Sequence, residues 1–336
     1  MEYREEIFES RQYKADYADG LERIIERRQT EAEAVRSEYV KDIFKCPERY
    51  RDDLKAMLGW PLIGHTDVAA PRVTSEKLSD EDGYTVHRVR IEVLDGLMLT
   101  GLFFKMDGED KKPLVIVQHG GLGTPELISG VYGKTSNYND MLHRVCRHGV
   151  HAFAPQLLLW DSKKYGVTHD RRTVDARLKR VGSSITAVEV YGITRALDYF
   201  EAENYVSGFG MIGLSYGGFY TLYTAAVDTR IRSAVSCSFF NSRDKAGWPD
   251  WTWQSSAEKF DDAEIACLIY PRTLMIEMGG KDNLFDSKYT VASFEKAEKL
   301  SEGLGGDWID LKVFDGVHEL YKGDEHIERL IREIKK

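Results

Sequence analysis

The stretch GMIGLSYGGFYTLYTAA, residues 210–226, brings a run of small and apolar residues up to a serine that glycines flank on both sides. The residues before Ser215 are apolar enough for a buried strand, and those after Gly218 have the composition of a helix. A sharp reversal from a strand into a helix needs glycines, because a Cβ there would collide with the other element. Gly213 and Gly217 stand two residues on either side of the serine, so the stretch predicts a tight strand–turn–helix with Ser215 at its apex.

Outward from this turn, short apolar runs alternate with stretches of helical pattern. Strands are expected at 113–120, 150–155, 208–215, 231–240, 272–280 and 308–314, and helices at 138–149, 183–203, 218–228, 287–305 and 327–334. Ser183 or Ser184 suits the N-cap of the second of these helices. Residues 84–106 alternate apolar and polar side chains on both sides of Asp95-Gly96, which indicates a β-hairpin. The pattern predicts an α/β fold: a mostly parallel sheet with helices on both faces and an antiparallel edge.

The N-terminal part of the chain reads differently, because residues 1–60 are rich in Glu, Arg, Ala and Tyr and carry helical spacings of apolar residues. Gly59 suits the end of the last helix there. We expect the following organisation: a helical extension at 1–75 and a catalytic domain at 76–336, with lid-like insertions near 156–182 and 240–262. The extension is expected to pack on the domain, and the alternative is an arm that joins copies into a homo-oligomer.

Composition excludes several classes of protein. The chain has 336 residues, a net charge of −9 and scattered Lys and Arg, so it lacks the basic patch of a nucleic-acid binding protein. The sequence contains no run of about 18 apolar residues, which a membrane-spanning helix would need. The N-terminus also lacks the apolar core of a signal peptide. A cytoplasmic location is therefore the default expectation. Cys237 and Cys267 lie in apolar runs, which predicts buried thiols and neither disulfides nor metal ligands.

A serine in this turn is a candidate nucleophile, but its hydroxyl needs a base and a residue that orients the base. Asp282 directly follows one expected strand, and His318 follows the next. The order Ser215, Asp282, His318 fits a triad in which Asp282 holds the imidazole and His318 takes the serine proton. Asp282 also suits a plain turn, and Asp315, three residues before His318, is the competing acid. We expect Asp315 to shape its loop.

Two backbone N–H groups must stabilise the oxyanion that forms during acyl transfer. The residue after the nucleophile, Tyr216, supplies one. The other is expected from the glycine-rich loop at 118–126, where Gly121 is the first candidate and Leu122 the second. His119 in that loop is expected to be a structural hydrogen-bonding residue, because its position does not suit a triad base.

The segments HGGLG, GLSYGG, GGKD and GVHE, in this order, resemble the α/β-hydrolase superfamily over about residues 76–336. GLSYGG is similar to prolyl oligopeptidase-type peptidases, but a propeller does not fit in the 75 residues before the domain. DDLKAMLGWPL and VIVQHGG look like the dienelactone hydrolase-like and acetyl-xylan-esterase-like hydrolases. A cysteine nucleophile marks true dienelactone hydrolases, and Ser215 points instead to ester hydrolysis.

The resemblance implies a serine esterase that acts on a small-molecule ester with a short-chain or carbohydrate-linked acyl group. It implies no metal, no organic cofactor and no nucleic-acid or membrane partner. A carbon–carbon bond hydrolase or a small peptidase is the alternative. A non-catalytic binding protein on the same fold is disfavoured, because Ser215, Asp282 and His318 are all present.

The insertion near 240–262 carries three tryptophans, Trp248, Trp251 and Trp253. Loops at this edge of an α/β sheet form the ligand site, so the rings and Leu122 are candidate substrate contacts. Tryptophans there stack on a sugar ring or wall an acyl pocket. The alternative is that they only pack a small lid or meet another subunit.

Overall fold

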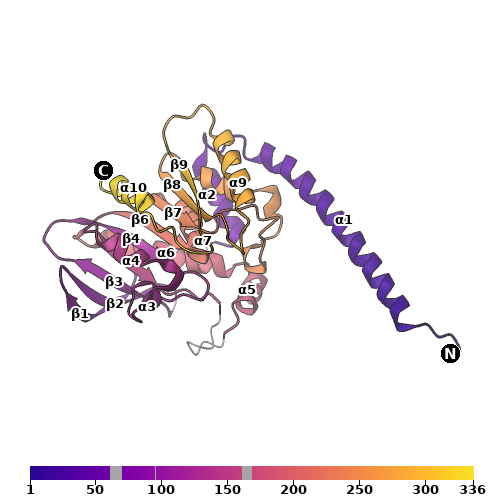
Figure 1. Ribbon diagram of the computed structural model, residues 1–336, viewed down its shortest axis with the longest axis horizontal. Helices are drawn as coiled ribbons and strands as arrows, with labels where there is room; N and C mark the ends of the chain where they lie inside the picture. The colour runs from indigo at the N-terminus through magenta and orange to yellow at the C-terminus, as the bar shows by residue number, and fades with distance from the viewer. Residues whose placement is uncertain (61–69, 95, 161–168) are drawn as a thin grey trace.

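Nine strands form one continuous sheet in the order β1-β2-β3-β5-β4-β6-β7-β8-β9 (Figure 1). The computed structural model describes residues 1–60, 70–94, 96–160 and 169–336. The strands are β1 Val73–Glu81, β2 Tyr84–Leu94, β3 Leu97–Met106, β4 Lys112–Gln118, β5 His151–Pro155, β6 Val206–Leu214, β7 Ile231–Cys237, β8 Thr273–Gly279 and β9 Ile309–Phe314. Neighbours from β5 to β9 pair in parallel, while β1, β2 and β3 pair antiparallel and β3 joins β5 antiparallel.

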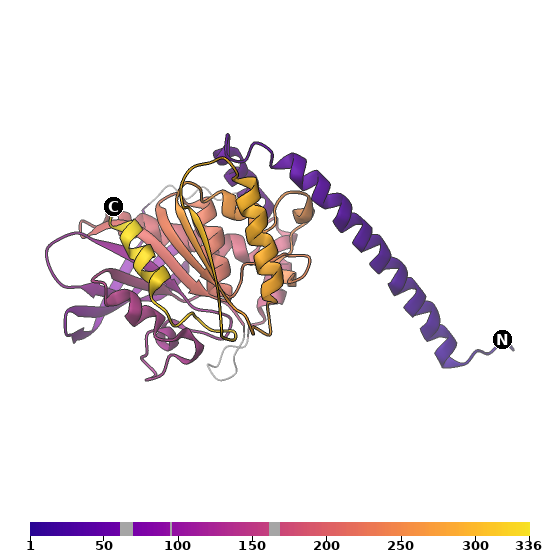
Figure 2. The ribbon, with the colours of Figure 1, turned by 45° about the horizontal axis from the view of Figure 1, so that its top comes forward.

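Helices cover both faces of this sheet (Figure 2). The α-helices are α1 Ile7–Tyr39, α2 Pro47–Leu58, α3 Pro125–Ile128, α4 Met141–Cys146, α5 Arg171–Arg180, α6 Ile185–Ala202, α7 Tyr216–Val227, α8 Asp262–Cys267, α9 Ser287–Leu300 and α10 Glu325–Ile334. In β4, Leu114 and Ile116 join the apolar cluster under α2, α6 and α7, whereas Val115 and Val117 join the cluster under α4 and α10. A strand buried on both faces reads as an unbroken apolar run, which explains its sequence.

The expected alternation of strands and helices is confirmed, and the α/β-hydrolase fold class with it. Ser184 is the N-cap of α6, and its side chain accepts a hydrogen bond of 3.1 Å from the N–H of Ala187. Helix α4 is shorter than expected, because Asn139 and Asp140 adopt left-handed backbone angles just before it. Helices α3, α5 and α8 and the edge strand β1 were not expected from the sequence.

The N-terminal extension is mainly helical up to residue 60, as expected, but only part of this helical segment packs on the domain. Residues 61–69 of the extension lie outside the described residues, and β1 begins at Val73. Helix α2 is seated on α6 and α7, and Gly59 ends it with a φ of 91°. Helix α1 meets the domain through its last third, and the rest projects away from it (Figures 1 and 2). The expectation that the whole extension packs on the domain is therefore wrong for most of α1.

All four cysteines are free thiols. Cys237 and Cys267 are buried, as expected, and burial raises the pKa of both thiols. Cys46, at the start of α2, is exposed. Within the described ranges, no helix combines the length and the apolar character needed to cross a membrane.

Candidate active site

Ser215 stands at the turn between β6 and α7, with φ 61° and ψ −121°. This left-handed backbone conformation is strained for a residue with a side chain. The flanking glycines leave no room for a methyl group: a Cβ on Gly217 would lie 2.1 Å from the carbonyl oxygen of Gln118, and one on Gly213 would lie 2.4 Å from Gly217. The turn expected from the sequence is therefore present, and steric contact explains its glycines.

The same turn fixes Ser215 at the carboxyl edge of the sheet. Its N–H donates a hydrogen bond of 2.8 Å to the carbonyl oxygen of Cys237, the last residue of β7. The loop after β4 passes beside it, because a Cβ on Gly120 would lie 3.2 Å from the Cβ of Ser215. Ser215 therefore lies between the ends of three neighbouring strands.

His318 and Asp282 are joined by a hydrogen bond of 2.8 Å between Nδ1 and Oδ2. The other carboxylate oxygen of Asp282 accepts the N–H groups of Leu284 and Phe285, at 2.8 Å and 3.1 Å. Burial raises the pKa of Asp282, but the hydrogen bond and charge of His318 and these two N–H donors outweigh burial, so the pKa lies below its ordinary value. Asp282 is therefore a carboxylate that fixes the Nδ1 side of the imidazole ring.

The loop that carries His318 bends back over the end of β7. Asn137 makes two hydrogen bonds to it. The side-chain Nδ2 donates to the carbonyl oxygen of His318 at 3.0 Å, and the backbone carbonyl oxygen accepts the N–H of Leu320 at 2.9 Å. The carbonyl oxygen of Glu319 accepts a contact of 3.3 Å from the thiol of Cys237. Because Cys237 is also the backbone partner of Ser215, these contacts bring the His318 loop to the strand end next to the serine.

Asp315 does not contact His318 in this arrangement. It is exposed and forms an ion pair of 2.5 Å with Lys281. Of the two acids that the sequence offered, the structure joins Asp282 to His318.

The two expected oxyanion donors are the backbone N–H groups of Tyr216 and Gly121. Tyr216 directly follows Ser215, and Gly121 belongs to the loop after β4. Among the described residues, neither backbone N–H has a hydrogen-bond acceptor. The N–H of Gly120 does have one, since it donates to the hydroxyl of Tyr138 at 2.8 Å. The carbonyl oxygen of Gly121 accepts the N–H of Trp160 at 2.9 Å, which fixes the orientation of this peptide.

His119 is fully buried in the loop after β4, which carries Gly121 and is called the oxyanion loop here. Its two ring nitrogens contact this loop and the loop after β5. Nδ1 lies 2.9 Å from the carbonyl oxygen of Gly120, and Nε2 accepts the N–H of Leu157 at 3.2 Å. Burial lowers the pKa of His119 to about 4, so the ring is neutral near neutral pH. The expected structural role of His119 is confirmed by these contacts.

A buried ionic cluster, which was not expected from the sequence, contacts Tyr216 through Asp250. Arg171 is only 3% exposed and binds Asp250 at 2.6 Å and Glu189 at 2.8 Å. It also donates to the hydroxyl of Tyr220 at 2.7 Å and to the carbonyl oxygen of Leu158 at 2.6 Å. Buried charges are stable only when they are paired, and Arg171 pairs with both carboxylates. The cluster joins α5, α6 and α7 directly below the candidate oxyanion residue Tyr216.

The three expected tryptophans have different surroundings. Trp251 and Trp253 are 1% and 7% exposed and pack on Phe219 and Tyr223 of α7, so both are core residues. The structure therefore gives no support to a substrate contact by either ring. Trp248 is half-buried, stacks on Trp251 with 4.4 Å between the ring centroids, and lies 6.1 Å from the ring of Phe285.

Phe285 in turn lies 5.8 Å from the ring of His318, between centroids. Trp248 is thus one aromatic ring away from the imidazole, while Leu122, beside Gly121, is 55% exposed. Of the four side chains that the sequence offered as substrate contacts, Trp248 and Leu122 are the two that are not buried.

Comparison with known proteins finds a matching family model, a related protein and similar solved structures. A model of the dienelactone hydrolase family matches residues 101–318, well over half of the chain. The "Putative hydrolase YtaP" of Bacillus subtilis (strain 168) is 28% identical over 243 residues, which cover 62% of this chain and 77% of that protein.

Among solved structures, a "putative acetyl xylan esterase" from Bacteroides fragilis matches with a TM-score of 0.68 and 16% identity, over 88% of this chain and 83% of that one. A glucuronoyl esterase from Solibacter usitatus matches with a TM-score of 0.59 and 16% identity, over 85% of this chain and 91% of that one. At this identity the two likenesses support the fold alone.

Proposed function

The chain belongs to the dienelactone hydrolase family, and from that premise we propose that it is a serine hydrolase that cleaves carboxylic esters through an acyl-enzyme on Ser215. The observation that carries the proposal is the placement of Ser215. It occupies a strained turn beside the oxyanion loop, at the sheet edge to which the His318–Asp282 pair is folded back. The structural relatives are named for the hydrolysis of esters, which supports the same reaction class.

In the proposed first step, Nε2 of His318 takes the hydroxyl proton of Ser215 while Oγ bonds to the carbonyl carbon of the ester. The N–H groups of Tyr216 and Gly121 stabilise the negative charge on the carbonyl oxygen. When the tetrahedral intermediate collapses, the bond to the alcohol oxygen breaks and His318 gives its proton to that oxygen. Water then attacks the acyl-enzyme with His318 as base, which releases the acid and restores Ser215.

The role of Asp282 in this scheme is to hold His318. An acceptor on Nδ1 keeps the proton there and leaves Nε2 free to act as base. The low pKa of Asp282 keeps the group ionised, so it also stabilises the imidazolium that forms in each half-reaction.

The proposal is tested with p-nitrophenyl acetate, butyrate and longer esters, and with a fluorophosphonate label, on the wild type and on Ser215→Ala. We expect the wild type to be labelled and to turn over at least one ester, and the variant to do neither. Equal, negligible rates and no labelling in both proteins would overturn the proposal. Turnover that survives in Ser215→Ala would overturn the assignment of the nucleophile.

A further inference from the structure

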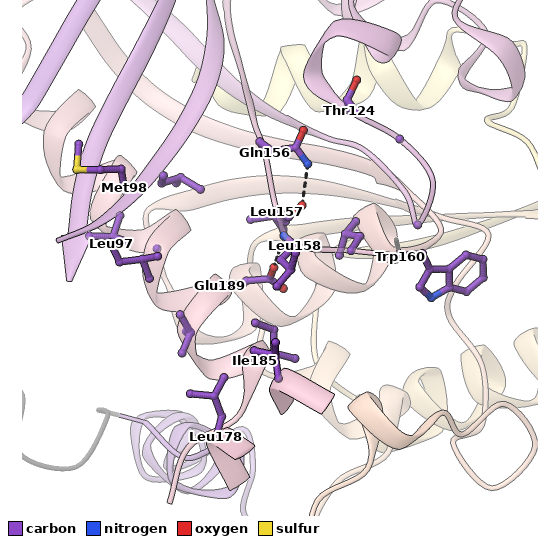
Figure 3. Close-up of a pocket in the computed structure, with 18 of the residues that line it drawn as sticks. Leu97, Met98, Thr124, Gln156, Leu157, Leu158, Trp160, Leu178, Ile185 and Glu189 are labelled. Atoms are coloured by element: carbon purple, nitrogen blue, oxygen red, sulfur yellow. Dashed lines mark hydrogen bonds between the residues drawn. The ribbon is translucent and has the colours of Figure 1, made fainter. Parts of the chain in front are cut away.

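A cavity of about 980 Å³ opens beside the oxyanion loop (Figure 3). It lies between the turn of β2 and β3, the loop after β5, and helices α5 and α6. Gly121, Leu122 and Trp160 belong to its wall, so it is continuous with the candidate site. A volume of this size accommodates a small-molecule ligand.

The cavity wall is mostly aliphatic. Its apolar lining is Val93, Leu94, Leu97, Met98, Leu99, Leu122, Leu157, Leu158, Leu159, Val174, Leu178, Ile185 and Val188. Leu97 and Met98 lie on one side, Leu178 and Ile185 on a second, and Leu157 and Leu158 on a third (Figure 3).

The polar side chains on this wall include Thr124, Tyr132, Gln156 and Glu189. All four interact with other groups of the protein, and the hydroxyl of Thr124 accepts the N–H of Leu127 at 3.1 Å. One oxygen of Glu189 accepts the N–H of Leu158 at 2.8 Å, and the other binds Arg171. The amide of Gln156 donates to the carbonyl oxygen of Leu157 at 2.7 Å. A sugar bound here would lose hydrogen bonds to water and find few partners, whereas an apolar group would gain from burial.

We propose that this cavity binds the apolar half of the ester, a medium-length alkyl or aromatic group, with the ester carbonyl at Gly121. This inference rests on the proposed function and narrows its substrate class. The apolar group belongs either to the acid or to the alcohol of the ester, and the two sources share the same chemistry. Two pairs of esters distinguish the acid from the alcohol as the source. Hydrolysis of p-nitrophenyl decanoate is compared with that of p-nitrophenyl butyrate, and hydrolysis of decyl acetate with that of butyl acetate.

The first test is chain-length preference. We expect kcat/KM to be at least tenfold higher for the ten-carbon member of one of the two pairs. Val188→Trp fills the cavity from α6 and should reduce that ratio tenfold or more. Tyr199→Trp, on the same helix outside the cavity lining, is the matched control and should leave the ratio unchanged. Absence of a preference in both pairs, or an equal ratio in Val188→Trp, would overturn the inference.

The second test does not require turnover. Decanol is titrated into Ser215→Ala by calorimetry, and into Ser215→Ala that also carries Val188→Trp. We expect saturable binding in the first protein and at least a tenfold weaker affinity in the second. If decanol binds in this way but no ester is cleaved by the wild type, the proposed reaction fails and the cavity remains. If esters are cleaved but decanol does not bind, the cavity inference fails alone.

A second inference rests on a different feature, the free part of helix α1. Seven large apolar side chains on it are 43–74% exposed: Ile7, Phe8, Tyr13, Tyr17, Leu21, Ile24 and Ile25. Tyr13, Tyr17, Leu21 and Ile25 follow one another at a spacing of four, so they share one face of the helix. We call this row and its neighbours the α1 stripe.

The α1 stripe continues into the part of α1 that is seated on the domain. Ala32, seven residues after Ile25, is buried, and Arg36 binds Glu264 of α8 at 3.3 Å. These contacts fix the direction in which the free part leaves the domain. Residues 7–27 therefore form an arm about 32 Å long, and Arg28, the next residue, binds Glu258 of the domain at 3.2 Å. A helix in water gains most of its stability from packing of its apolar face, and nothing on this chain covers that face of the arm within the described residues.

The charges beside the α1 stripe favour an antiparallel partner of the same sequence. On one flank of the helix, Glu9 and Asp16 are followed by Arg23 and Arg27. Antiparallel pairing of two arms sets the acidic N-terminal half of this flank against the basic C-terminal half of the partner's, whereas parallel pairing sets like charges together. Residues 1–31 contain nine acidic and six basic residues, which does not suit an anionic membrane surface.

We infer that the α1 arms of two copies pair antiparallel through the α1 stripe and that the chain is a dimer. Sedimentation equilibrium of the full 38.4 kDa chain should give twice this mass at micromolar concentration. Leu21→Glu with Ile25→Glu should give the monomer mass. Gln12→Glu with Thr30→Glu adds the same charge on the opposite face and should remain dimeric, and circular dichroism shows whether each variant is folded. A wild type that stays monomeric, or a dimer that persists in the stripe variant, would overturn the inference.

Discussion

The hydroxyl of Tyr216 donates a hydrogen bond of 2.7 Å to Oδ2 of Asp250. The same oxygen accepts Nε of Arg171, so the side chain of the candidate oxyanion residue is tied to the buried ionic cluster. The indole N–H of Trp160 also donates to the Tyr216 hydroxyl, at 3.1 Å, and the backbone N–H of Trp160 donates to the carbonyl oxygen of Gly121. Both proposed oxyanion donors are therefore positioned by one set of contacts that includes Arg171.

Replacing Arg171 by Met should be strongly destabilising, because Asp250 and Glu189 would be left buried without a cation. Removal of one partner from a buried ionic pair costs about 3–5 kcal/mol. Guanidinium unfolding of the variant should show a loss of this size in the free energy of unfolding. Arg172→Met, one residue along and exposed, is the control and should change it little. A loss below about 1 kcal/mol in Arg171→Met would contradict the proposed importance of the cluster.

Asp282→Asn should reduce kcat for ester hydrolysis roughly 10³-fold or more, because an amide no longer holds the imidazole in the required tautomer. The KM should change little, since Asp282 does not reach the substrate in the proposed mechanism. Asp315→Asn is the matched control, because it removes the competing acid, which pairs with Lys281. Comparable losses in the two variants would show that the acid has been assigned to the wrong residue.

Gly217→Ala should destabilise the protein by at least about 2 kcal/mol, because its Cβ would overlap the carbonyl oxygen of Gln118 at 2.1 Å. Gly192, within α6, is a matched control: its Cβ would meet Val93 at 3.7 Å, which is an ordinary contact. Gly192→Ala should instead stabilise the protein by about 0.5–1 kcal/mol through helix propensity. Thermal and denaturant unfolding give both values, and equal signs for the two variants would refute the steric explanation of the turn.

Stability should fall in acid partly through His119. Its pKa is about 4 in the fold and near 6.5 in an unfolded chain, so the unfolded state binds the proton first as the pH falls. The contribution is fully present above about pH 6.5 and is lost progressively toward pH 4, by ~3 kcal/mol.

The measurement for His119 is the free energy of unfolding at pH 7, 5.5 and 4, for the wild type and for His119→Gln. Gln keeps an acceptor for the N–H of Leu157 and does not titrate. The wild type should lose more stability than the variant over this range, and His151, whose pKa burial also lowers to about 4, cancels in the difference. Parallel pH profiles would exclude His119 as a source of the acid sensitivity.

The parts of the fold that were predicted correctly are those with a local cause. The strands around Ser215 are buried on both faces, so each appears as an apolar run in the sequence. The turn itself needs glycines at fixed offsets, which a sequence displays directly. Strand β1 was missed because it is an exposed edge strand whose residues are mostly polar, so it carries no alternation of apolar and polar residues.

The parts that were missed depend on partners far away in the sequence. Arg171 stands in a charged segment that resembles any solvated helix, and its partner Asp250 lies 79 positions later. The tryptophans of the long loop show the same limit. The sequence places Trp248, Trp251 and Trp253 in one loop, but only the packing on α7 decides which rings turn inward.

The exposed thiol of Cys46 has a practical consequence. It stands at the start of α2, shortly after the C-terminal end of α1, while the other three cysteines are buried. One reagent molecule per chain should therefore attach at this position without any engineering of the sequence. If two arms pair antiparallel about their middle, spin labels on the two thiols would be roughly 70 Å apart. In a parallel pair the two labels would be close together. The distance between labels on Cys46 therefore distinguishes the two arrangements.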